Sequence, residues 1–157
     1  MKVIQGELVA PTKKIGIVVS CFNEDITDRL LESAQQRCVK LGIDGKLLTV
    51  VRVPGAVEIP IIASLLAQQE DIAAIVCLGA VIKGETAHFE YVNQVCTEGC
   101  HRVMLDNHKP VIMGVLTTYT YAQAVARVDG EVIDTGATAI DTACKMVSLC
   151  TQIKNTV

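Results

Sequence analysis

Four β-branched apolar runs alternate with segments of helical periodicity, and this alternation limits the fold more than any other feature of the chain. The runs span residues 14–20, 46–53, 71–78 and 110–117. The intervening and following segments predict helices at residues 24–41, 60–69, 89–104, 121–126 and 136–152. A repeated strand–helix order is typical of a parallel sheet whose right-handed crossovers place helices on both faces. We therefore predict an α/β protein: a single-domain, three-layer α/β/α sandwich with a four-stranded, flavodoxin-like parallel sheet.

The composition fits one such domain over residues 1–157. Half of the residues are hydrophobic but only 3% are aromatic, so the core must be aliphatic, which suits buried parallel strands. So much apolar surface on a small chain predicts a homo-oligomer. Residues 1–12 alternate weakly and are interrupted by Pro11, which indicates either an edge strand or an N-terminal arm that reaches a neighbouring subunit.

Charge and motifs exclude several classes of protein. A net charge of -3 with almost no aromatic residues argues against a nucleic-acid partner. No apolar run is long enough for a membrane span and the N-terminus lacks the basic-then-apolar layout of a signal peptide, so we expect a cytoplasmic protein. The chain has no Walker sequence, no G-x-G-x-x-G and no G-x-S-x-G, which disfavours NTP hydrolysis, dinucleotide redox chemistry and serine-type acyl transfer.

The seven cysteines are odd in number and form no C-x-x-C pair. Most lie inside apolar runs, which predicts reduced, buried thiols. Cys96, Cys100 and His101 are close enough in sequence to share a helix face, but a zinc site needs a fourth ligand and the sequence offers none. We expect no metal.

One stretch, residues 79–91, concentrates two glycines, charged groups, a hydroxyl and a histidine between the third strand and the next helix. Ligands bind beyond the carboxyl ends of parallel strands, and a helix N-terminus there favours an anion. We predict a phosphate at Gly84-Glu85-Thr86. His88 would lie in the first helical turn, either as a proton-transfer group or as an ordinary helix histidine.

The other strand ends should converge on the same rim. Phe22 follows the first strand and is either core or a stacking platform. Glu58 follows the second and either caps the next helix or accepts hydrogen bonds from ligand hydroxyls. The fourth strand brings Met113, and Arg127 beyond it is either solvated or a phosphate partner.

Four blocks in order and spacing resemble the 6,7-dimethyl-8-ribityllumazine synthase family of riboflavin biosynthesis. They are Phe22-Asn23, VPGAVEIP at 53–60, GAVIKGETAHFEY at 79–91 and GVLTT at 114–118. The resemblance implies condensation of 5-amino-6-(D-ribitylamino)uracil with 3,4-dihydroxy-2-butanone 4-phosphate, with release of phosphate and water and without metal or organic cofactor. It also implies a pentamer or a pentamer-based assembly with sites between subunits.

The resemblance also implies roles for individual residues. Phe22 would stack on the pyrimidine, and Val81 and Ile82, with Ala80 beside them, would meet its edge. The ribityl chain would be held by Ala56, Val57 and Glu58. The phosphate would be held by Gly84, Glu85, Thr86 and Arg127, and His88 would shuttle protons. Met113 and Arg127 would serve the site of the adjacent chain.

The chain departs from the family pattern in places. Cys21 stands where a basic residue is usual, Lys83 where arginine is usual, and Ala87 where proline is common. Asp134-Thr135 replaces an Asn-Lys pair whose lysine helps bind phosphate. These changes predict weaker binding of the butanone phosphate with the reaction retained.

Two other functions use a similar pocket. A lumazine- or flavin-binding shell protein with poor catalysis is compatible with the altered Asp134-Thr135 loop. A flavodoxin-like electron carrier is disfavoured, because no phosphate loop follows the first strand.

Overall fold

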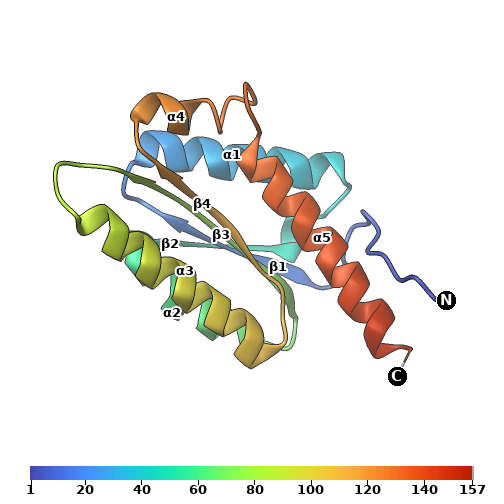
Figure 1. Cartoon of the computed structure of the whole chain (residues 1–157). Helices are drawn as coiled ribbons and strands as arrows, with labels where there is room; N and C mark the ends of the chain where they lie inside the picture. The colour runs from blue at the N-terminus through green and yellow to red at the C-terminus, as the bar shows by residue number, and fades with distance from the viewer. Residues whose placement is uncertain (157) are drawn as a thin grey trace.

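A four-stranded, all-parallel sheet forms the centre of the computed structural model, which describes residues 1–156. Its spatial order is β2 (Leu48–Val53), β1 (Lys14–Ser20), β3 (Ile72–Ile82) and β4 (Val111–Thr118). Helices α1 (Glu24–Lys40), α4 (Tyr121–Val125) and α5 (Thr135–Lys154) cover one face, and α2 (Ile59–Ala67) and α3 (His88–Asn107) cover the other (Figure 1). The predicted three-layer architecture is confirmed.

The central strands β1 and β3 are buried on both faces, as is typical of parallel sheets, whereas the edge strand β2 is only partly buried. Along β1, Ile17 and Val19 pack toward α1 and α5, whereas Val18 packs toward α2. Gly136 lies where α5 meets α1, and a Cβ there would collide with the backbone of Leu30. The two helices therefore approach closely because this position carries no side chain.

The largest difference from the predicted elements is at the end of β3. The strand was expected to end at residue 78, but it continues to Ile82, so Gly79 to Ile82 are not part of a turn. These four residues keep their extended form because β4 pairs with them throughout, from Gly79 with Val115 to Ile82 with Thr118. Two short 3-10 turns, η1 (Gly45–Leu47) and η2 (Ala56–Glu58), border β2.

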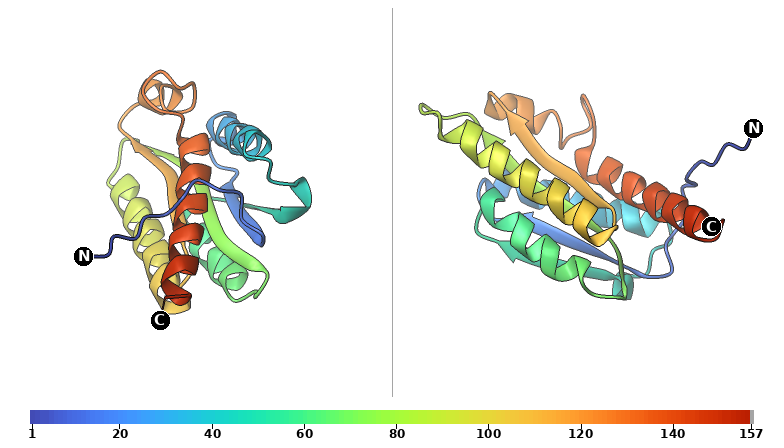
Figure 2. Two further views of the ribbon diagram at one scale, coloured as in Figure 1. Left: turned by 90° about the vertical axis from the view of Figure 1, so that its right-hand side faces the viewer. Right: turned by 60° about the horizontal axis from the view of Figure 1, so that its bottom comes forward.

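Residues 1–12 contain no strand within the single chain. The segment instead crosses α5 (Figure 2). The Glu7 amide donates to Ser148 Oγ at 3.1 Å, and Gln152 Nε2 donates to the Gln5 carbonyl at 3.1 Å. No helix among residues 1–156 has the length and apolar character to cross a bilayer.

Candidate active site

A pocket of about 500 Å³ lies at the carboxyl ends of β1, β2 and β3, against the first turns of α3. It is lined by residues from the loop after β1, from η2, from the end of β3 and from the start of α3. These are Phe22, Gly55, Val57, Glu58, Ala80, Val81, Ile82, Gly84, Thr86, His88, Phe89 and Val92. The structure thus brings together most of the residues that the sequence places at the rim.

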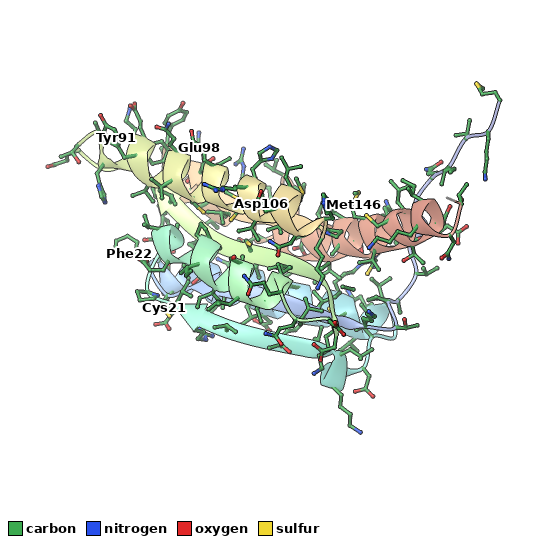
Figure 3. The ribbon with its side chains drawn as sticks, turned by 90° about the horizontal axis from the view of Figure 1, so that it is seen from below. Cys21, Phe22, Tyr91, Glu98, Asp106 and Met146 are labelled. Carbon is green, nitrogen blue, oxygen red and sulfur yellow. The ribbon has the colours of Figure 1, made fainter. Side chains whose placement is uncertain are left out.

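Phe22 is 70% exposed, so the alternative that it packs in the core is wrong. Its backbone is fixed by hydrogen bonds across the sheet end: the Cys21 amide donates to the Val53 carbonyl at 2.8 Å, and the Phe22 amide donates to the Pro54 carbonyl at 3.1 Å. Asn23 follows in the left-handed conformation at φ 58°, which turns the chain into α1. Figure 3 shows Phe22 at the end of the molecule where α3 begins. A ring presented on a fixed backbone can stack on a planar ligand.

Glu58 does not cap α2 with its side chain, so the helix-cap alternative is wrong. It occupies the N-cap position, but its carboxylate turns toward Gly55, where a side-chain methyl group would lie 3.1 Å from Glu58 Oε2. The side chain is exposed and lines the pocket. An exposed carboxylate beside the pocket can accept hydrogen bonds from ligand hydroxyls.

The last residues of β3 extend past β1 and leave one edge of the strand open. The pairing of β1 with β3 ends at Val19 and Leu78, whereas β3 and β4 stay paired to Ile82. The Lys83 amide donates to the Thr118 carbonyl on β4 at 2.9 Å, and the Ala80 carbonyl accepts from Asn23 Nδ2 on the opposite side at 2.9 Å. Since alternate residues of a parallel strand direct their N–H and C=O groups to opposite edges, those of Ile82 face the open edge. Val81 directs its N–H and C=O groups toward β4, and it also lines the pocket.

The segment between β3 and α3 forms the polar end of the pocket. Gly84 and Thr86 line it, and the Thr86 hydroxyl accepts a hydrogen bond from the His88 amide at 3.3 Å. His88 is the first residue of α3 and is exposed. The free N–H groups of the α3 N-terminus favour an anion here, next to the imidazole. Glu85 is exposed and is not part of the pocket lining.

Three residues expected at the site, Ala56, Met113 and Arg127, do not line this pocket. Ala56 is buried in the core under α2 and α3. Met113 lies in the middle of β4, paired with Cys77, so it does not reach the carboxyl-end rim. It lines a separate hollow of about 430 Å³ with Ile133 and Thr135. Arg127 follows α4 and donates from Nη1 to the Gln123 carbonyl at 2.8 Å.

Asp134 has a structural role that the sequence did not reveal. Its carboxylate caps α5 by accepting from the Ala137 amide at 3.1 Å, and it also accepts from the Ser33 hydroxyl on α1. Thr135, expected in a loop, is the first residue of α5. The negative charge at Asp134 is therefore bound to a helix N-terminus, which reduces its effect on a nearby anion.

Val92 and Gly55 line the pocket and were not among the predicted site residues. Val92 lies four residues after His88 on α3, and such pairs share a helix face, so the spacing could have identified it.

Among residues 1–156, no group of three or more His, Cys, Asp or Glu side chains is arranged to hold a metal ion. Cys96 and Cys100 are buried while His101 is exposed, so the three do not face one another. The neighbouring Cys77 and burial raise the pKa of Cys100 to about 12, which keeps this thiol protonated.

Known proteins match the chain over nearly its whole length. The family model described as 6,7-dimethyl-8-ribityllumazine synthase matches residues 12–151. A protein of that name from Coxiella burnetii is 47% identical over 143 residues, which cover 91% of this chain and 95% of the relative. Others come from Syntrophus aciditrophicus, 44% identical over 96% of this chain and 98% of the relative, and from Thermus thermophilus, 43% identical over 94% of each.

Proposed function

Because the chain belongs to the 6,7-dimethyl-8-ribityllumazine synthase family, we propose that the pocket at the carboxyl ends of its strands carries out that synthesis. The protein is an enzyme of riboflavin biosynthesis. It condenses 5-amino-6-(D-ribitylamino)uracil with 3,4-dihydroxy-2-butanone 4-phosphate and releases phosphate and water. The observation that carries the assignment of the site is the placement of a stacking ring, a carboxylate and an imidazole around one pocket.

The uracil ring binds between Phe22 and the open edge of β3. Phe22 supplies an exposed face, and the N–H and C=O groups of Ile82 supply one donor and one acceptor to the polar edge of the ring. The ribityl chain then extends toward Val57 and Glu58, where the carboxylate accepts from its hydroxyls.

The butanone phosphate binds at the other end of the pocket. Gly84, Thr86 and the α3 N-terminus hold its phosphate, which places the ketone beside His88. The primary amine of the uracil attacks the ketone to form a Schiff base with loss of one water, and phosphate is then eliminated. The ribityl-bearing nitrogen closes the second ring with loss of another water, and His88 moves protons during these steps. Holding two substrates in reacting geometry is worth up to roughly 7–11 kcal/mol in ideal cases, which makes positioning a main source of the rate.

The assay mixes both substrates with the protein in the absence of added metal and follows lumazine absorbance against the uncatalysed background. We expect His88→Ala to lower kcat roughly a hundredfold or more, the size of a typical acid–base contribution. Phe22→Ala should mainly raise the KM for the uracil. His101→Ala, which removes an exposed histidine outside the pocket, is the matched control. An unchanged kcat in His88→Ala would show that the histidine has another role.

The complete site is formed between neighbouring subunits of a pentamer. Support comes from Met113, Arg127 and Thr135, which lie outside the pocket of their own chain. Apolar side chains also remain exposed on the outer surfaces of α2 and α3, including Ile61, Leu65 and Val95. Tyr91 on α3 is also exposed, and Figure 3 shows its side chain pointing away from the sheet. Burial against a second copy would remove this surface from water.

Co-expression of two inactive variants tests the shared site. In a ring of head-to-tail contacts, random mixing of His88→Ala and Arg127→Ala chains leaves roughly one quarter of the sites with both residues intact. We therefore expect the mixed assembly to recover about that fraction of wild-type activity. Activity no higher than that of the separate variants would place both residues in the site of one chain or exclude Arg127 from catalysis.

A further inference from the structure

A second hollow lies at the opposite end of the sheet from the active-site pocket. It has a volume of about 330 Å³ and is bounded by the segment before β1, the start of β3, the C-terminal end of α3 and the C-terminal end of α5. Figure 1 shows the ends of α3 and α5 at the same end of the molecule, away from the loop that precedes α3. From Ile72 to Ile82 the strand β3 spans ten steps, or about 33 Å, so the two sites are separate.

The charge of this hollow is strongly positive. Three lysines, Lys13, Lys109 and Lys154, line it together with His108, against the single carboxylate of Glu70. Three positive charges minus one negative charge leave an excess of two before His108 is counted. In residues 1–156, none of the three ammonium groups is paired with a carboxylate.

Two of the lysines are held in place by the backbone. Lys13 Nζ donates to the Glu70 carbonyl at 2.9 Å, and Lys109 Nζ donates to the Gln69 carbonyl, so both side chains are fixed beside the loop that follows α2. Each ammonium has three protons and uses one of them in these contacts. Burial, together with repulsion from Lys13 and Lys154, lowers the pKa of Lys109 below its ordinary value. Three positive charges that face a single carboxylate repel one another, and the binding of an anion between them relieves this repulsion.

We propose that this hollow binds a phosphate-bearing anion, with the phosphate among Lys13, Lys109 and Lys154. Thr12 and Thr151 add hydroxyl groups to the lining, and Ile72, Pro110 and Val147 add an apolar wall. The shared chemistry of the ligand is a phosphate group. The apolar wall provides room for a small organic substituent.

Tungstate is a suitable probe, because it is a tetrahedral oxyanion and its heavy atom is readily located in a crystal of the assembled enzyme. We expect tungstate among the three lysines in the wild type and a binding constant at least roughly tenfold weaker in the Lys109→Met/Lys154→Met variant, since each substitution removes a charged hydrogen-bond donor. Methionine keeps the aliphatic stem, and the unfolding midpoint of the variant without ligand reports on its fold. Lys46→Met removes an exposed lysine that lies outside the hollow and should leave binding unchanged.

Competition identifies the source of the phosphate group. If inorganic phosphate and glycerol phosphate displace tungstate at the same concentration, the hollow is a site for free phosphate. Stronger displacement by glycerol phosphate indicates an organic phosphate that uses the apolar wall. Tungstate found only in the active-site pocket, or bound equally by the double variant, would overturn the proposal, as would failure of both competitors.

Discussion

Replacement of Asp134 by alanine should destabilise the protein by about 2–3 kcal/mol, because one carboxylate serves three stabilising contacts. Loss of the N-cap hydrogen bond to Ala137 costs about 1 kcal/mol. Loss of the bond from Ser33, which joins α1 to α5, costs about 1 kcal/mol more. Removal of a negative charge from the α5 N-terminus adds about 0.5 kcal/mol.

The Asp134→Asn variant distinguishes the stabilisation that comes from the negative charge from the stabilisation that comes from the N-cap hydrogen bond. Asparagine keeps an oxygen that can accept from both donors, so only the charge–dipole part, about 0.5 kcal/mol, should be lost. Ser33→Ala removes the α1 contact alone, and a double-mutant cycle with Asp134→Ala should return a coupling of about 1 kcal/mol.

The measurement is urea unfolding followed by far-UV circular dichroism, since the chain has no tryptophan to report on folding. All variants are compared at one protomer concentration, because assembly contributes to the apparent stability. Equal stabilities of the alanine and asparagine variants would refute the argument, since the cap geometry would then contribute nothing.

Three further changes have definite expected outcomes. Thr135→Lys should lower the KM for the butanone phosphate roughly tenfold with little change in kcat, because lysine adds a charge-assisted contact to the phosphate. Steady-state kinetics measure this effect, and an unchanged KM would contradict the prediction. Gly136→Ala should lower the free energy of unfolding in urea by about 1–3 kcal/mol, because the new Cβ would collide with the backbone of Leu30. Gly45→Ala is the control: a Cβ at that position would have no neighbouring atom within 4 Å, so the change should be nearly neutral. Burial raises the pKa of Cys38 to about 11 from an ordinary value of 9.0, so its stabilising contribution is complete below pH 9 and is lost as the pH rises toward 11. Urea midpoints at about pH 8 and about pH 10.5, which bracket most of this titration, should therefore differ less in Cys38→Ala than in the wild type, and an equal difference would show that this thiol is not responsible.

The order of elements was predictable because hydrophobic periodicity is local. The strands are rich in Val and Ile, and the long helix α1 repeats its buried apolar residues at helical spacing. The end of β3 was not predictable in the same way. Gly79 and Ala80 have weak strand preference, and their extended form depends on pairing with Val115 and Leu116 of β4, far along the chain.

The same limit applies to the site residues: their position along the chain was predictable, but the direction of their side chains was not. Glu58 and Phe22 could be placed near a strand end from sequence, but the choice between cap and free carboxylate, or between core and platform, depends on side-chain direction, which only the tertiary structure fixes. For Asp134 the sequence indicated only an added negative charge near a presumed phosphate position, and it did not reveal the partners of the carboxylate, which lie on α1 and in the first turn of α5.

The open edge of β3 affects how freely the sequence of this pocket can change over evolution. In the proposed binding mode the ring is recognised by the N–H and C=O groups of Ile82, which belong to the main chain and which every residue except proline carries in full. Substitutions at this position that preserve the pairing of β3 with β4 leave the recognition pattern intact. In that binding mode position 82 can vary while the pocket still selects the same heterocycle, whereas Phe22 and His88 would act through their side chains and would have to be kept.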